Sequence, residues 1–298
     1  MISASRRRLA DGVKATGGRV SAGLNTLMGS RAHRAFGILF YHRVMPRLPG
    51  IPAPPLNVRP ERFRAQMEGL LERGYTFITL REMIRRNLHG GQLPSKTVAL
   101  TFDDGFACLY EHAWPVLKDL GIPATIFVVT AFVDLPVPMH FDVWGCENSR
   151  RMPEEAWRSL SWEECKAMEA SGVVEIGAHT HTHCDMSGDP VRFENDLREC
   201  MQSLEAGMGS PRRLFAFPFG DPALGYVNNG LMKAARNAGA RCALTTETQL
   251  IQPGDSPFGW GRLEVVEQDT GATLAAKLGG WYNWMRQVRN LAHTVAPW

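Results

Sequence analysis

Two short stretches of the sequence bring together side chains that can bind a metal and move a proton. LTFDDG holds adjacent carboxylates, Asp103 and Asp104, and EIGAHTHTHCDM holds His179, His181 and His183 at alternate positions. In an extended chain all three histidines share a face, whereas a strand that turns into a helix pairs only His179 with His183. Two imidazoles and one carboxylate suit a divalent transition metal, with positions left open for water and substrate. The second carboxylate is then free to act as a general base on the attacking water.

The elements that must position these side chains follow a repeated order. From residue 36 onward, apolar runs such as FGILFYH, TVALTF and ATIFVVT alternate with helical patterns. Helices are predicted over 60–73, 80–88, 107–120, 161–171, 189–207 and 228–238. This alternation predicts parallel strands wrapped by helices, and seven or eight strands favour a distorted (β/α)7–8 barrel over an open sheet. No nucleotide-binding glycine loop follows any of the strands.

The polar clusters fall where the predicted strands end. His42 follows ILFY, the two aspartates follow VALTF, His179 follows VVEIGA, and Phe219 follows FAFP. The carboxyl ends of barrel strands share one edge, and the loops there converge on one mouth. The segment 131–160 is long for a connection and is predicted to be a loop over that mouth.

Three motifs together resemble those of a known family. LTFDDG, GAHTHTH and FAFPFG, in this order and spacing, are similar to the motifs of the polysaccharide deacetylases, the NodB-homology carbohydrate esterases. The similarity extends from about Phe36, through YHRV, to LTTE and GRLEV, and is greatest to the exopolysaccharide deacetylase branch. It implies a distorted barrel of the NodB-homology type, and an enzyme that removes acyl groups from sugars with one divalent metal. Zinc is the metal expected, with cobalt, manganese, nickel and iron as alternatives.

The resemblance also implies a role for individual residues. It makes Asp103 the catalytic base and Asp104 a metal ligand, with His179 and His183 as the two histidine ligands. Thr180 then supplies a hydroxyl that steadies the loop. Because the family pattern takes the first and last histidines, the middle one is expected to point away from the metal or to line the pocket.

The sequence departs from the family pattern in two places. The usual late histidine that serves as general acid is absent, and His42 is the best replacement; the alternative is a histidine merely hydrogen-bonded at a strand end. Ala216 stands where the family has an arginine that orients the base. Arg262 is a candidate for that task, with a surface salt bridge as the alternative. The backbone N–H near Phe219 is expected to hold the oxyanion.

Composition and charge bear on location and partners. The net charge is +3, but residues 1–35 carry seven Lys or Arg against one acid, so that segment is near +6 and the remainder is slightly negative. A nucleic-acid-binding core is therefore not expected. We expect no cleaved signal, no membrane span, and a cytoplasmic protein whose six scattered cysteines are reduced.

Three segments are predicted: a basic N-terminal extension with helical character (1–35), a catalytic domain (36–270), and a C-terminal helix (271–298) packed on that domain or facing a membrane.

The function predicted from these observations is hydrolysis of an amide C–N bond. The enzyme is expected to remove N-acetyl groups from a polysaccharide containing N-acetylhexosamine, in exopolysaccharide biosynthesis. An acylated lipid-linked sugar is an alternative substrate, since the apolar residues near the start are close to helical spacing, which is typical of a helix that contacts an anionic membrane. The alternatives to this function are another metallohydrolase, a non-haem iron oxygenase or a catalytically silent glycan-binding relative. The oligomeric state is left open.

Overall fold

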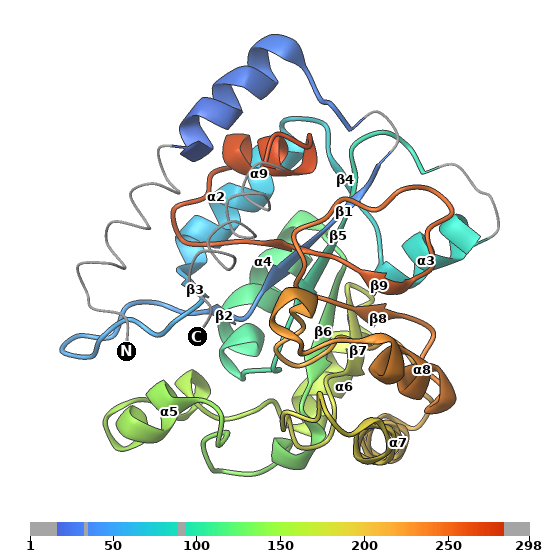
Figure 1. Ribbon diagram of the computed structural model, residues 1–298. Coiled ribbons are helices and arrows are strands. Elements are labelled where there is room, and N and C mark those ends of the chain that lie inside the picture. The colour runs from blue at the N-terminus through green and yellow to red at the C-terminus, as the bar shows by residue number, and fades with distance from the viewer. Residues whose placement is uncertain (1–16, 33–34, 89–92, 283–298) are drawn as a thin grey trace.

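Parallel strands surrounded by helices form the body of the molecule (Figure 1). The computed structural model describes residues 17–32, 35–88 and 93–282. The main sheet has the order β10-β1-β5-β6-β7, and β4 also pairs with β5. These strands are β1 (Gly37–Tyr41), β4 (Thr76–Phe77), β5 (Thr97–Phe102), β6 (Ala124–Val128), β7 (Val174–Ala178) and β10 (Leu263–Glu264).

Short parallel pairings extend the sheet beyond β7. Isolated bridges join Ala178 to Phe215 and Ala216 to Leu244. They lead to β8 (Ala243–Leu244), which pairs in parallel with β9 (Phe258–Trp260). A separate short pair, β2 (Arg43–Val44) with β3 (Asn57–Val58), lies after β1. The predicted α/β fold with an irregular parallel barrel is therefore confirmed.

The helices lie close to where the sequence pattern predicts them. Differences at their ends are one or two residues, except over 107–120, where a π-helical turn at Leu109–Ala113 precedes α4. Of the C-terminal helix predicted over 271–298, the structure shows α9, which ends at Leu278, and residues 283–298 lie outside the described part. Pro115 explains this turn, because it has no N–H to donate back along the helix. The helices are α2 (Pro60–Leu71), α3 (Leu80–Leu88), α4 (Trp114–Leu120), α5 (Val143–Asn148), α6 (Trp162–Ala170), α7 (Pro190–Met208), α8 (Asn229–Asn237) and α9 (Gly271–Leu278).

The strands that carry the site are held by buried apolar side chains. Every residue of β1, β5 and β6 is buried, as expected for parallel strands covered on both faces. Tyr41, Phe63 and Phe102 form an aromatic cluster that joins β1, α2 and β5, with ring centroids 5.3–5.8 Å apart. The strand ends that bear the polar side chains are therefore fixed by a rigid core.

The two ends of the described chain pack against each other. Residues 17–28 are helical and lie beside α9 (Figure 1). Ser21 Oγ donates to the Trp281 carbonyl at 3.4 Å, and Trp281 Nε1 donates to the Gly29 carbonyl at 2.9 Å. Within the described residues, no helix has the length and apolar character needed to cross a membrane.

Candidate active site

The polar residues at the strand ends line one cavity of about 430 Å³. His42 comes from the end of β1, Asp103 and Asp104 from the end of β5, and His179 and His183 from the end of β7. Most of the remaining wall is contributed by residues 55–56, 141–142, 217–224 and 246–248. The fold thus gathers these five residues at one edge of the sheet, as parallel strand ends should.

Three of these side chains form a compact group of potential metal ligands. One ligand atom each from Asp104, His179 and His183 lies within 4.8 Å of the others, and all three residues are buried. Asp104 Oδ1 is 3.5 Å from His179 Nε2 and 3.4 Å from His183 Nε2. No other such group occurs in the part of the chain that the structure describes.

The surroundings of these residues favour the forms that bind a metal. His179 Nδ1 lies 2.9 Å from the Ala216 carbonyl, which can only accept, so Nδ1 carries a hydrogen and Nε2 is the nitrogen that faces Asp104. Burial lowers the pKa of His183, which keeps its imidazole neutral. Burial raises the pKa of Asp104, but hydrogen bonds with the two histidines hold it well below its usual range. Two imidazoles and a carboxylate are ligand types that fit a divalent metal.

Left-handed backbone conformations at the site allow the side chains of neighbouring residues to line the same cavity. Asp104, Thr180, His183 and Phe219 have φ values of 70°, 64°, 56° and 60°, a region that non-glycine residues seldom adopt. The turn at Asp104 lets it and Asp103 both line the cavity, although adjacent residues of a strand point apart. Such strain is typical of functional sites, where the surrounding packing must offset its cost.

The turn at Thr180 separates the three histidines. Its hydroxyl accepts the backbone N–H of His183 at 3.1 Å, so the predicted contact within the loop is present. His181 instead points toward α7: its Nδ1 is 2.9 Å from Thr130 Oγ1, and its Nε2 is 3.3 Å from Glu199 Oε1. His181 is therefore outside the metal-ligand group.

Replacing His181 with alanine is expected to leave the metal content at that of the wild type. The side chain contacts α7 rather than the group around Asp104, so its loss removes no ligand. Metal analysis of purified protein checks this, with His183→Ala as the matched control that should release the metal. A loss of metal from the His181 variant would contradict the assignment.

Arg262 forms a buried pair with Asp103. Its two terminal nitrogens donate to the two carboxylate oxygens at 2.6 and 2.8 Å, and its Nε donates to the Thr245 carbonyl at 3.0 Å. The arginine is 0% exposed, so the alternative of a surface salt bridge is wrong. Burial raises the pKa of Asp103, but the charges of Arg262 and His179 and the arginine hydrogen bonds outweigh it, leaving that pKa below its ordinary value. The carboxylate is therefore fixed in place and ionised.

The predicted general acid and oxyanion donor also lie at this cavity. His42 lines it and is close enough for its charge to lower the pKa of both aspartates. Phe219 is the central residue of a tight turn in which Gly220 N–H donates to the Pro218 carbonyl at 2.6 Å. In the described part of the chain, no acceptor is bonded to the Phe219 N–H.

The long segment 131–160 contributes Asp142, a loop carboxylate that was considered for the site, and Phe141, which the sequence pattern did not identify. Phe141 stacks on the His183 ring at a centroid distance of 3.7 Å. Asp142 forms a buried ion pair with Arg43, whose guanidinium lies 3.6 Å from the centroid of the Phe106 ring. The segment was predicted to cover the mouth, and these contacts show which residues it places there; no motif marks them.

Comparison with known proteins gives consistent similarities. The family model described as polysaccharide deacetylase matches residues 90–243. The poly-beta-1,6-N-acetyl-D-glucosamine N-deacetylase of Staphylococcus epidermidis is 24% identical over 234 residues, 76% of this chain and 73% of that one. IcaB from Ammonifex degensii is a structural neighbour with 27% identity and a TM-score of 0.67, covering 83% of this chain and 97% of that one. Streptococcus pyogenes deacetylase PplD, solved with acetate, shares the fold at 20% identity, with a TM-score of 0.66 and coverage of 82% and 98%.

Proposed function

The chain belongs to the polysaccharide deacetylase family, and we propose on that premise that it hydrolyses the N-acetyl groups of a polysaccharide containing N-acetylhexosamine. The observation that carries this proposal is the ionised Asp103 in one cavity with a buried Asp104, His179 and His183. A base beside a group of metal ligands suits hydrolysis of an unreactive amide. The similarity to the Staphylococcus epidermidis enzyme favours a poly-β-1,6-N-acetylglucosamine substrate made as an exopolysaccharide.

Each step of the reaction is assigned to a different residue of the chain. Asp103 takes a proton from the attacking water, and Arg262 holds the carboxylate in the orientation this requires. The Phe219 N–H donates to the oxyanion that forms at the acetyl carbon. His42 protonates the departing nitrogen as the C–N bond breaks, which yields acetate and the free sugar amine. When bound by Asp104, His179 and His183, a divalent metal, which we propose is zinc, supplies Lewis acidity toward the carbonyl and toward water.

The substrate proposal is tested by measuring acetate release from N-acetylglucosamine oligomers of equal length. The wild type is expected to release acetate from β-1,6-linked oligomers about tenfold faster than from β-1,4-linked ones, a difference of about 1.4 kcal/mol in transition-state binding. Equal rates would contradict the assignment of the linkage. No acetate from any oligomer, with metal supplied, would contradict the deacetylase activity itself.

Replacing His42 with alanine is expected to lower kcat for acetate release about 100-fold, because the leaving amine then has no positioned acid. Hydrolysis of 4-nitrophenyl acetate is the control, since nitrophenolate leaves without a proton and the variant should keep near-wild-type rates on this ester. An equal loss on both substrates would show that His42 has another task.

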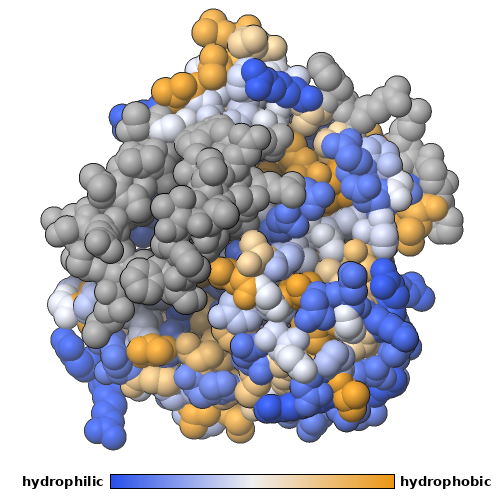
Figure 2. Space-filling view, viewed as in Figure 1, coloured by the Kyte–Doolittle hydropathy of each residue, from blue (hydrophilic) through white to orange (hydrophobic). Residues whose placement is uncertain are grey.

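We also propose that the helix at residues 17–28 contacts an anionic membrane, at the cytoplasmic face. Val20, Leu24, Leu27 and Met28 lie on one side of it and are 60, 37, 84 and 67% exposed. Figure 2 shows apolar surface at the top of the view, where this helix lies. An exposed apolar face in a segment near +6 in charge complements a negatively charged lipid surface. This location favours a lipid-linked sugar as the second substrate candidate.

The membrane proposal is tested by sedimentation with vesicles at low salt. The protein is expected to sediment with vesicles rich in phosphatidylglycerol, and a Leu24→Ser, Leu27→Ser variant is expected to remain in the supernatant. Leu88→Ser, an exposed leucine on α3, is the matched control and should bind like the wild type. Failure of the wild type to sediment would contradict the proposal.

A further inference from the structure

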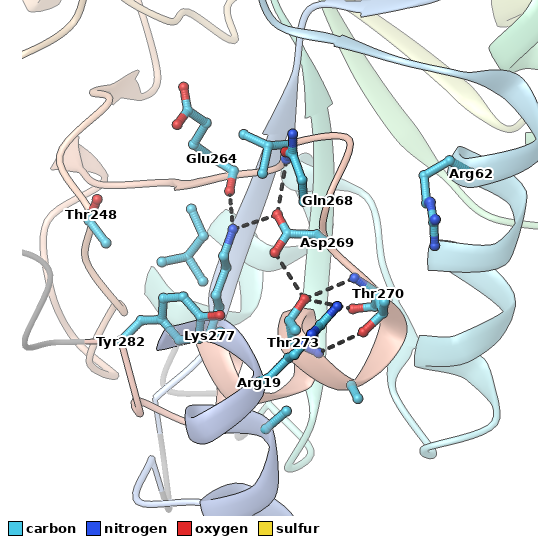
Figure 3. A pocket seen from close by; sticks show the side chains of 15 residues that line it. Arg19, Arg62, Thr248, Glu264, Gln268, Asp269, Thr270, Thr273, Lys277 and Tyr282 are labelled. Atoms are coloured by element: carbon cyan, nitrogen blue, oxygen red, sulfur yellow. Dashed lines mark hydrogen bonds and ion pairs between the residues drawn. The ribbon is translucent and has the colours of Figure 1, made fainter. Parts of the chain in front are cut away.

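A second cavity, of about 530 Å³, adjoins the one that holds the motif residues. Its walls come from the helix at residues 17–28, from α2, from α9 and from the segment that leads to α9 (Figure 3). Thr248 and Glu264 line both cavities, so the two share a border. A volume of several hundred Å³ is typical of sites for small molecules or single sugar units.

The charged side chains that line this cavity carry one excess positive charge, since Arg19, Arg62 and Lys277 stand against the carboxylates of Glu264 and Asp269. Lys277 is neutralised, because its ammonium lies 2.6 Å from Asp269 Oδ2 and donates to the Glu264 carbonyl at 2.7 Å. Arg19, on the N-terminal helix, and Arg62, on α2, also line the cavity (Figure 3). Among the residues that the structure describes, no carboxylate forms an ion pair with either arginine. Two guanidinium groups are thus available to an anion.

The rest of the lining suits the sugar to which such an anion is attached. Thr248, Gln268 and Thr270 offer hydroxyl and amide groups, and Ala22 and Val266 offer apolar surface. Hydroxyl and amide groups can hydrogen-bond the hydroxyls of a sugar ring, and the apolar wall can contact its carbon face. A cationic glucosamine unit, in contrast, would be repelled by both arginines.

We propose that this cavity binds a phosphoryl group carried by the glycan, near the sugar whose acetamido group lies at Asp103. The planar guanidinium matches the oxygens of a phosphate, which is why arginine is preferred at such sites. This proposal rests on the proposed function, because it requires that one glycan occupies both adjoining cavities, with its acetylated sugar in the first and its phosphoryl group in the second. The phosphoryl group can belong to a sugar phosphate or to a lipid-linked sugar diphosphate, and the two share this chemistry.

Binding without turnover tests the proposal. In calorimetric titrations the wild type is expected to bind N-acetylglucosamine 1-phosphate at least about tenfold more tightly than N-acetylglucosamine, a gain typical of a charge-assisted pair. Arg19→Gln and Arg62→Gln should each remove most of that difference. Arg192→Gln, which replaces an exposed arginine of α7 that lines neither cavity, is the control and should keep it.

Three results would overturn the proposal. They are equal affinity for the two sugars, undiminished affinity in both arginine variants, and inorganic phosphate bound as tightly as the phosphosugar, which would indicate a simple anion site.

A further titration identifies the source of the phosphoryl group. Tighter binding of a farnesyl-diphosphate-linked sugar than of the 1-phosphate would assign it to a lipid carrier, and the reverse order would assign it to a soluble sugar phosphate. Acetate release by the wild type from uncharged oligomers is a separate readout. Its absence would contradict the deacetylase function and leave the result of the binding titrations intact.

Discussion

Replacing Asp103 with asparagine is expected to lower kcat for acetate release by about 1,000-fold without loss of metal. The size follows from the usual contribution of a general base, about 100- to 10,000-fold. Asparagine keeps the shape of the side chain but cannot take a proton from water. The proposed metal ligands are separate residues, so metal content should stay at the wild-type value. Steady-state acetate release and metal analysis on the same preparations measure both quantities.

Asp104→Asn is the matched control for this expectation, since the neighbouring carboxylate belongs to the ligand group. That variant should lose both the metal and the activity, whereas the Asp103 variant should lose activity alone. If Asp103→Asn retains more than about a tenth of wild-type kcat, the loss is too small for a general base. In that case Asp103 is not the base.

Replacing Arg262 with methionine should lower the free energy of unfolding by about 3–5 kcal/mol at neutral pH, the usual cost of breaking a buried pair. The reason is that Asp103, which is 2% exposed, would keep its burial and lose its only arginine partner among the described residues. Activity should also fall, because the carboxylate would no longer be held in one orientation. Urea denaturation followed by circular dichroism measures the stability change. Arg81→Met, which breaks the exposed pair with Glu175, is the control and should cost less than about 1 kcal/mol.

The stability difference should depend on pH in a defined direction. The pKa of Asp103 in the folded protein is below its ordinary value of about 3.9. A group with a depressed folded pKa stabilises the protein above its unfolded pKa, and that contribution is lost as the pH falls through the folded value. Burial without the arginine raises the pKa of Asp103 in the variant, so its carboxylate is protonated first as the pH falls, and the gap between wild type and Arg262→Met should be larger at pH 7 than at pH 3. An undiminished gap at pH 3 would show that Arg262 acts through packing and not through Asp103.

Much of the fold could be predicted because apolar residues repeat with the period of each element. TVALTF and ATIFVVT are buried throughout, as their composition predicts, and the helices begin and end close to their predicted bounds. RLFAFP was predicted as a strand, but only Phe215 and Ala216 form bridges there. Pro218 cannot donate to a neighbouring strand, and the chain turns sharply at the next residue.

The candidate site was predictable where a motif keeps its residues close in sequence. Asp103, Asp104, His179 and His183 each lie at a strand end, so their meeting follows from parallel strands alone. Arg262 could be given only two alternative roles, orienting Asp103 or forming a surface salt bridge, because the choice depends on which strand closes the sheet beside β1. The pairing of Leu39 with Leu263 decides this and brings Arg262 to the base. Residues of the segment 131–160 could not be assigned, because a long connection has no fixed register.

The pair of Arg262 with Asp103 joins residues that are 159 positions apart, and this separation has a consequence for protein synthesis. A ribosome completes Asp103 long before it reaches Arg262, and an emerging chain ends without β10 during that interval. Until Arg262 has been synthesised, folding β5 into the core would bury the Asp103 carboxylate without a positive partner. The cost of removing this charge from water disfavours that step before the arginine is present. We expect Asp103 to reach its final position among the last events of folding, after most of the chain has left the ribosome.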